Sequence, residues 1–176
     1  MESKDNGSQL VFKGIRFDVR SIQVKAPNGK VVKREYVVHP GAVVILPLVD
    51  KEHVIMIRNQ RFAVKKNLWE LPAGTLEPNE PPHDTASREL LEETGYHAAK
   101  IELLTTFYTS PGICNEIMWA YLAQDLTLHG QQLDEGEEIQ TEILPWRQVL
   151  KMVQDGTICD GKTIAALLYY HTFVAT

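Results

Sequence analysis

The segment from Gly74 to Tyr96, GTLEPNEPPHDTASRELLEETGY, constrains the fold of this chain more than any other stretch. Its glycine and proline residues predict a loop. Pro82 suits the first position of a helix, where a missing backbone N–H costs nothing. Gly95 can adopt the left-handed conformation that ends a helix. The segment therefore predicts a loop followed by a helix over about residues 82–94.

The predicted helix carries four charged residues within six positions. At about 100° per residue, Glu89, Glu92 and Glu93 fall within an arc of about 100°. Arg88 lies one turn before Glu92, close enough to hydrogen-bond it. The flank that would pack against a sheet consists of Ala86, Leu90 and Thr94. The helix thus combines a buried flank with three converging carboxylates.

Two explanations of these carboxylates are open. Glutamate pairs on helices are most often exposed and hydrated. However, Glu89 and Glu93 are four residues apart with no lysine between them, and like charges at this spacing destabilise a helix. A bound cation would remove that conflict. Carboxylate oxygens suit Mg²⁺ or Mn²⁺, which often bridge protein carboxylates and substrate phosphates.

Composition limits the classes of protein to consider. The chain has 176 residues, 44% of them hydrophobic, which is enough for one substantial core. Its net charge of -5 argues against broad binding of nucleic acid or of an acidic membrane surface. No apolar run approaches the length of a membrane span. The two cysteines, Cys114 and Cys159, are far apart and suggest neither a disulfide framework nor a zinc site. We expect a cytoplasmic protein.

The order of predicted elements indicates one domain. Residues 1–9 are polar and expected to be disordered or frayed, and residues 10–176 are expected to fold as a unit. Alternating apolar and polar residues predict antiparallel strands over about 10–26 and 30–38, with an Asn-Gly pair marking the hairpin turn. The continuous hydrophobicity of AVVILPLVD predicts a strand buried on both faces.

Further strands and two more helices complete the expected α+β fold. The predicted strands are HVIMIRNQR, AKIELLTTFYTSP, EIMWAYLAQDL and EILPW, and the predicted helices are residues 146–155 and KTIAALLYYHTFV. No internal repeat or linker divides the chain.

The central segment resembles the Nudix box, the signature of the Nudix hydrolase family. The residues that carry the resemblance are Gly74, Glu80, Arg88, Glu89, Leu90, Glu92, Glu93 and Gly95. The sequence departs from the pattern only at Tyr96, where the family usually has an aliphatic residue, a change that concerns packing. The resemblance implies a central mixed β-sheet sandwiched between helices (α/β/α), here with an N-terminal antiparallel β-hairpin extension.

The resemblance also implies an activity and its site residues. Nudix hydrolases cleave a pyrophosphate bond in a nucleoside diphosphate linked to another group, using a divalent metal such as Mg²⁺, with Mn²⁺ possible. By position in the motif, the implied metal ligands are Glu89, Glu92, Glu93 and the carbonyl of Ala73. Arg88 and Glu80 are implied to support the loop and orient the glutamates.

A second resemblance concerns the substrate. Pro111 stands 16 residues after Gly95, and together with WELPAG it resembles the ADP-ribose pyrophosphatases and related nucleoside-diphosphate-sugar hydrolases. This implies hydrolysis of ADP-ribose to AMP and ribose 5-phosphate. The alternatives are another nucleotide, such as GDP-mannose, NADH or a dinucleoside polyphosphate, or a non-catalytic nucleotide-sugar sensor. A Pro-Gly pair also forms ordinary turns.

The acidic loop DEGEE, residues 134–138, supplies candidates for a catalytic base. That subgroup draws a base or an extra metal contact from a late acidic loop, and Glu135 and Glu137 are the preferred candidates here, ahead of Glu138. A hydrated loop without a catalytic role is the alternative.

Six residues outside the box are candidates for substrate binding. Arginine can hold phosphate oxygens in pairs, aromatic rings can stack on a base, and carboxylates can accept from sugar hydroxyls. The candidates are Arg34, Arg61, Phe17, Tyr36, Glu70 and Glu116. The alternative is that the arginines simply lie on the surface and the aromatic residues pack in the core, without a role in substrate binding.

The N-terminal strands have a further implied role. In relatives of this subgroup they cross to a partner subunit, so we expect a homodimer through residues 10–38. An isolated hairpin is only marginally stable and needs another surface to cover it.

Overall fold

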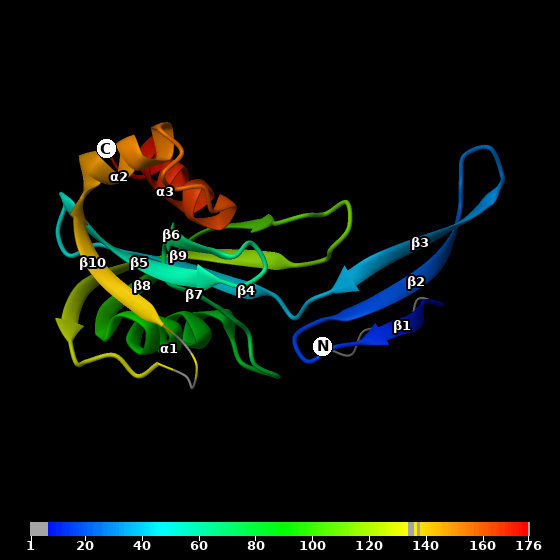
Figure 1. Cartoon of the computed structure of the whole chain (residues 1–176), viewed down its shortest axis with the longest axis horizontal. Coiled ribbons are helices and arrows are strands. Elements are labelled where there is room, and N and C mark those ends of the chain that lie inside the picture. Colours follow the sequence, from blue (N-terminus) through cyan, green and yellow to red (C-terminus); the bar gives the residue numbers. More distant parts are fainter. Residues whose placement is uncertain (1–6, 134–135, 137, 176) are drawn as a thin grey trace.

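The computed structural model describes residues 7–133, 136 and 138–175. Strands dominate, and three helices are found among the described residues (Figure 1). The elements are β1 (Gln9–Lys13), β2 (Asp18–Lys25), β3 (Val31–Val38), β4 (Ala42–Pro47), β5 (His53–Arg61), β6 (Lys66–Glu70), β7 (Ala73–Thr75), α1 (Pro82–Thr94), β8 (Tyr96–Tyr108), β9 (Ile117–Leu128), β10 (Ile139–Pro145), α2 (Trp146–Gln154) and α3 (Gly161–Phe173). None of the described helices is long and apolar enough to cross a membrane.

The body of the protein has three layers. Figure 1 shows α1 on one side of the strands and α2 with α3 on the other. One sheet has the order β7-β4-β9-β8, in which β4 and β9 are parallel and the other pairs antiparallel, and a second sheet has the order β10-β5-β6. The expected α/β/α arrangement with mixed pairing is confirmed. The strands are divided between two sheets instead of forming one.

The position of strand β4 between the helical layers explains why its sequence is continuously hydrophobic. Val44 and Leu46 point into the core beneath α2 and α3, whereas Val43 and Ile45 pack with residues of α1. Because successive side chains of a strand point to opposite faces, a strand covered on both faces has no polar positions. All six residues of β4 are buried, as the sequence predicts.

The N-terminal strands form a separate three-stranded antiparallel sheet, β1-β2-β3, that extends away from the body (Figure 1). The prediction of one strand over residues 10–26 is wrong, because a turn at 14–17 folds the chain back. The Gly14 N–H donates to the Phe17 carbonyl at 3.1 Å, and Lys13 then pairs with Asp18. Alternation of apolar and polar residues continues across this turn and hides it. The turn between β2 and β3 lies at the predicted Asn-Gly pair, where Gly29 has a φ of 80°.

Backbone hydrogen bonds join this sheet to the body near one loop. The Val37 N–H donates to the Ile113 carbonyl at 2.8 Å, and the Asn115 N–H donates to the Val37 carbonyl at 3.2 Å. Ile113 and Asn115 lie in the connection between β8 and β9. The end of β3 is therefore fixed to the loop that contains the Ser-Pro-Gly sequence.

Candidate active site

Helix α1 begins and ends where the sequence predicts. Pro81 caps its start, Pro82 is its first residue, and Gly95 ends it in the left-handed conformation with a φ of 77°. A Cβ at position 95 would approach the backbone of Gly130 and Gln131 to 2.7 Å. Both the conformation and the contact therefore require glycine. Burial of Ala86, Leu90 and Thr94 confirms the predicted packing flank.

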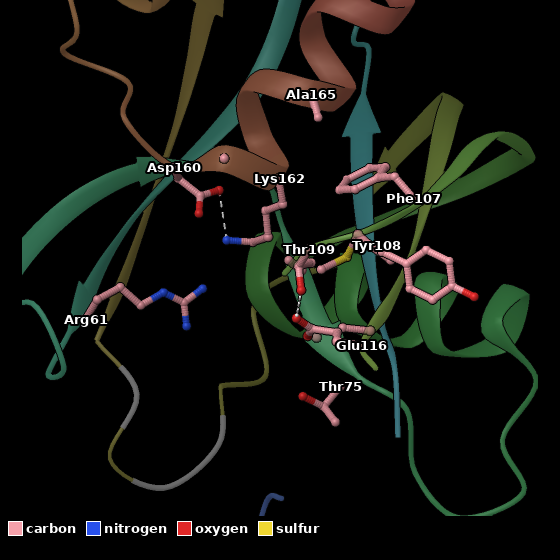
Figure 2. Close-up of a pocket in the computed structure, with 14 residues that line it drawn as sticks. Arg61, Thr75, Phe107, Tyr108, Thr109, Glu116, Asp160, Lys162 and Ala165 are labelled. Carbon is pink, nitrogen blue, oxygen red and sulfur yellow. Dashed lines mark hydrogen bonds and ion pairs between the residues drawn. The ribbon is translucent and has the colours of Figure 1, made fainter. Parts of the chain in front are cut away.

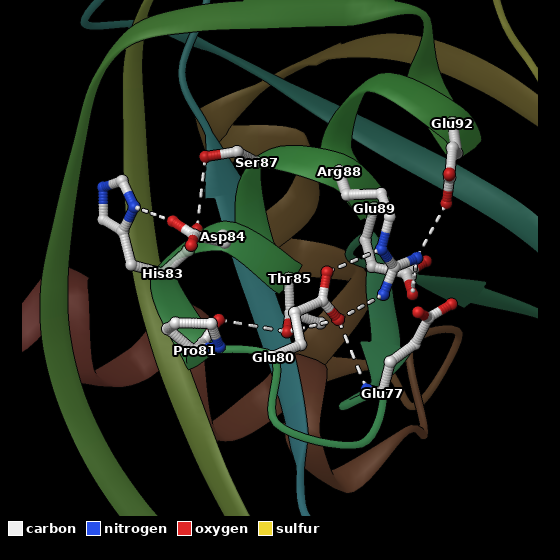
Figure 3. A network of polar contacts seen from close by, with 10 residues as sticks. All are labelled: Glu77, Glu80, Pro81, His83, Asp84, Thr85, Ser87, Arg88, Glu89 and Glu92. Carbon is white, nitrogen blue, oxygen red and sulfur yellow. Dashed lines mark hydrogen bonds and ion pairs between the residues drawn. The ribbon is translucent and has the colours of Figure 1, made fainter.

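Arg88 is the centre of a polar network at the start of the site (Figure 3). Its Nε and Nη2 donate to Glu80 Oε1 and Oε2, both at 2.9 Å. Its Nη1 donates to Glu89 Oε1 at 2.7 Å and to Glu92 Oε2 at 2.8 Å. One guanidinium thus holds the loop and two of the box carboxylates in fixed relation. The predicted contact between Arg88 and Glu92 is confirmed.

Glu80 is the partly buried partner that fixes Arg88. Besides Arg88, the Thr85 hydroxyl donates to Glu80 Oε2 at 2.9 Å. The hydrogen bonds from Arg88 are the main cause that lowers the pKa of Glu80 to about 2. The same hydrogen bonds raise the pKa of Arg88 further above its ordinary value. Both groups are therefore charged throughout the neutral range.

Glu89 and Glu93 both reach the short strand β7. Glu93 is only 4% exposed, and its Oε2 accepts a hydrogen bond from the Ala73 N–H at 2.8 Å. The Glu89 carboxylate lies so close to Gly74 that a Cβ at position 74 would overlap it. The glycine at the start of the box is thus explained by the space that a carboxylate occupies.

A divalent cation fits the chemistry of these donors, although the described residues do not form a complete coordination site for it. No three histidine, cysteine, aspartate or glutamate side chains in the described part of the chain are arranged as a metal-binding group. Glu89 and Glu93 nevertheless bring carboxylate oxygens to one backbone segment, and the missing side chain of Gly74 makes room for them. Hard oxygen donors of this kind are those that Mg²⁺ prefers.

A pocket of about 580 Å³ opens beside β7 (Figure 2). Ala73 and Gly74 form part of its wall, so the box meets the pocket there. Arg61, at the end of β5, and Glu116, before β9, also line it. Among the sequence-predicted substrate residues, these two therefore share the pocket with the box.

Glu70 lies behind the pocket wall. It is completely buried, and its two oxygens accept from Arg61 Nε at 2.7 Å and Nη2 at 2.6 Å. Lys162 forms a second ion pair with Glu70 Oε2. The carboxylate expected to accept from sugar hydroxyls is instead bound by two cations. Its hydrogen bonds raise the pKa of Arg61.

Sequence reasoning missed Asp160 and Lys162, which line the pocket at the start of α3. Asp160 caps the helix by accepting from the Thr163 N–H at 3.0 Å, and it pairs with Lys162 at 2.9 Å. Burial opposes ionisation of Asp160, but the Lys162 charge and the Thr163 hydrogen bonds outweigh it and lower the pKa of Asp160. An aspartate two residues before the predicted helix is a capping signal that could have located this end of the pocket.

Glu116 is held at the opposite end of the pocket. The Thr109 hydroxyl donates to Glu116 Oε2 at 2.6 Å (Figure 2), and His39 Nδ1 lies 3.3 Å from Glu116 Oε1. His39 follows β3, and its backbone N–H donates to Asn115 Oδ1 at 2.8 Å. Glu116 therefore links the N-terminal sheet to the pocket.

The other three substrate candidates lie on the N-terminal sheet. Arg34 and Tyr36 belong to β3, and Phe17 precedes β2 and is 45% exposed. Tyr36 lines a smaller pocket of about 350 Å³ together with Tyr108 and Pro111. The described lining of the main pocket includes none of the three.

The two candidates for a catalytic base, Glu135 and Glu137, lie outside the described residues. Glu138, beside them in sequence, precedes β10 and borders a recess with Arg58 and Gln60.

Comparison with known proteins agrees with this site. The NUDIX domain family model matches residues 38–167. The chain belongs to the Nudix family. This Nudix chain is 40% identical to an ADP-ribose pyrophosphatase of Bacillus subtilis (strain 168), with 96% of this chain and 92% of the relative aligned. It is 36% identical to a methanol dehydrogenase activator of Bacillus methanolicus, over the same shares of the two chains.

A solved structure extends the likeness to the fold. The crystal structure of an ADP compounds hydrolase superposes with a TM-score of 0.81 at 26% sequence identity, covering 95% of this chain and 91% of the other. Together the family match and these relatives identify this Nudix protein as a pyrophosphohydrolase.

Proposed function

We propose that this protein hydrolyses ADP-ribose to AMP and ribose 5-phosphate with Mg²⁺. The observation that carries the proposal is the meeting of Glu89 and Glu93 at β7, on the wall of a pocket that also contains Arg61. Carboxylates for a divalent cation and an arginine for phosphate oxygens are what a diphosphate substrate needs. The ADP-ribose pyrophosphatase relative, which aligns with most of this chain, supports the choice of substrate.

Glu89, Glu92, Glu93 and the Ala73 carbonyl are the groups that would hold the metal. When bound, Mg²⁺ neutralises phosphate oxygens and lowers the pKa of an attacking water. Mn²⁺ has the same ligand preferences and is the alternative. Arg88 holds Glu89 and Glu92 in place, while the Ala73 N–H holds Glu93. These contacts restrain the three carboxylates, although the described residues do not form a complete cation site.

Other residues would bind the phosphate, sugar and nucleoside groups of the substrate. Arg61 is our choice for a phosphate group, because its side chain is 36% exposed and lines the pocket. Glu116, fixed by Thr109, is our choice for a sugar hydroxyl. Arg34, Phe17 and Tyr36 remain proposals for the nucleoside end, and Glu135 and Glu137 remain proposals for the base.

We propose a homodimer through the N-terminal sheet. This sheet exposes a run of large apolar side chains that the body leaves uncovered: Leu10, Val11, Phe12, Ile15, Phe17, Val24 and Val31. Within the described residues, the buried Nε of Arg20 on β2 has no hydrogen-bond partner. Exposed apolar surface of this kind typically marks an interface. A second copy of the chain would cover it.

A cytoplasmic location is also part of the proposal. Cys114 and Cys159 are both free cysteines, as expected in a reducing compartment.

A substrate panel tests the proposed activity. ADP-ribose, GDP-mannose, NADH, a dinucleoside polyphosphate and a nucleoside triphosphate would be incubated with Mg²⁺ or with chelator, and the products separated. We expect ADP-ribose to have the highest kcat/KM, to give AMP and ribose 5-phosphate, and to be inert with chelator. If another member of the panel has the highest kcat/KM, that compound replaces ADP-ribose as the proposed substrate. No hydrolysis of any member would favour a nucleotide-sugar sensor.

A further inference from the structure

Lys162 occupies a position in the pocket that the Nudix box does not account for. It is the second residue of α3, its side chain is only 13% exposed, and it lines the pocket. It forms ion pairs with the buried Glu70 and with Asp160. Figure 2 shows Lys162 and Arg61 reaching toward the same part of the pocket, from α3 and from β5.

Arg61 depends on the same carboxylate as Lys162. It uses Nε and Nη2 to hold Glu70, and among the described residues its Nη1 has no hydrogen-bond partner. Nη1 is therefore the part of Arg61 available to a substrate oxygen. Besides Glu70, the charges of Glu93 and then Asp160 contribute to the raised pKa of Arg61. Three carboxylates thus act on this guanidinium, and Lys162 pairs with two of them, Glu70 and Asp160.

The charge balance of the cluster requires Lys162. Arg61 and Lys162 carry two positive charges, and Glu70 and Asp160 carry two negative charges, so the four groups are neutral together. Without the lysine, the same cluster would have a net charge of -1, beside the box glutamates and in a chain of net charge -5. A phosphate group entering the pocket would then meet repulsion in a partly buried region, where charge interactions are strong.

Hydrogen bonds through Thr163 connect the start of α3 to the backbone that leads into the box. Asp160 accepts from the Thr163 hydroxyl at 2.6 Å, and that hydroxyl oxygen accepts from the Leu71 N–H at 2.9 Å. Leu71 lies between β6 and β7. The cluster at the start of α3 is thus tied to the backbone that leads into Ala73 and Gly74.

We propose that Lys162 is a positioning residue for substrate binding: it neutralises Glu70 and Asp160, so that Arg61 keeps Nη1 turned to the pocket and its charge available to a substrate phosphate. This inference rests on the proposed function, because it takes a diphosphate compound as the ligand. It assigns to Lys162 an effect on binding and not on the chemical step.

The test combines binding with kinetics for Lys162→Met, Lys162→Arg and a control. Lys100→Met removes a lysine that is half exposed and pairs with Glu102 on β8. Binding of ADP-ribose is measured by calorimetry in chelator, where no hydrolysis is expected, and kcat and KM are measured with Mg²⁺. For Lys162→Met we expect Kd and KM to rise about tenfold or more, with kcat within about threefold of the parent. Lys162→Arg and Lys100→Met should bind within about threefold of the parent.

The outcomes separate this inference from the proposed function. If the parent protein hydrolyses no member of the substrate panel, the proposed function fails, and the calorimetric Kd still decides the role of Lys162. An unchanged Kd and KM in folded Lys162→Met overturns the inference. So does equal loss of binding in Lys162→Arg and Lys162→Met, because the charge would then not be the cause. If Lys162→Met does not fold, Lys162→Gln replaces it under the same criteria.

Discussion

At the scale of residues, one arginine organises the carboxylates of the box. Arg88 contacts Glu80, Glu89 and Glu92, while Glu93 is held separately by the backbone of Ala73. Three carboxylates that would repel one another in an isolated helix are thereby stabilised in the folded protein. The network restrains the positions of the box carboxylates.

The pKa of Glu80 gives this network a measurable pH dependence. Its pKa falls from 4.5 to about 2 on folding, mainly through hydrogen bonds from Arg88. A carboxylate with a lowered pKa stabilises the folded state above its unfolded pKa, and the effect is lost as pH falls toward its folded pKa. Because this carboxylate is partly exposed and solvent screens its charge, Glu80→Gln should be less stable than the parent by about 1–2 kcal/mol near pH 7.

Urea unfolding at several pH values measures this effect. The difference in unfolding free energy between the parent and Glu80→Gln should shrink as pH falls from about 4.5 to about 2. Glu35→Gln removes an exposed carboxylate paired with Lys33 and serves as the control. A pH-independent difference would contradict the assigned charge state.

At the scale of elements, local signals predicted the box well. Proline at the start and glycine at the end set the bounds of α1, and the 3.6-residue period identified its buried flank. The prediction of one strand over residues 10–26 was wrong because the alternation of apolar and polar side chains continues across the turn at 14–17. The pairing of Arg61, Glu70 and Lys162 was not predictable, because it joins β5, β6 and α3 through tertiary packing.

Gly74 allows a test of the contact between β7 and α1. In Gly74→Ala, the new methyl group would displace the Glu89 carboxylate, which is the flexible end of a side chain. We expect kcat to fall by about tenfold or more, while the free energy of unfolding changes by less than about 2 kcal/mol. Parallel measurements of kcat and of urea unfolding provide the check. Normal kcat in the folded variant would contradict a requirement for this position of Glu89.

At the scale of the whole molecule, the N-terminal sheet is the part least supported by the body. It contacts the body at the loop between β8 and β9, and it exposes apolar side chains on β1, β2 and β3. Sequence analysis predicted its hairpin, and its dimeric role remains a proposal. The substrate residues of the pocket were harder to predict, since Arg61, Glu116 and Lys162 come from distant parts of the chain.

Light scattering at micromolar concentration tests the proposed dimer. The chain has a mass of 19.9 kDa, so a dimer would have about 40 kDa. Phe12→Asp and Val31→Asp place charges on the exposed sheet and should yield monomers, whereas Val64→Asp, at an exposed apolar position outside that sheet, should not. A monomeric parent with full activity would exclude a functional dimer.

The most direct test of the central claim is the turnover of ADP-ribose by Glu93→Gln with Mg²⁺. Glutamine keeps the shape of Glu93 and can still accept from the Ala73 N–H, but it removes the charge proposed to hold the metal. Glu102→Gln, which removes an exposed carboxylate on β8, is the matched control. We predict that kcat falls by about a hundredfold or more in Glu93→Gln, with the fold retained, and is unchanged in Glu102→Gln. Near-normal turnover by Glu93→Gln would contradict the assignment of the box as the metal-dependent catalytic site.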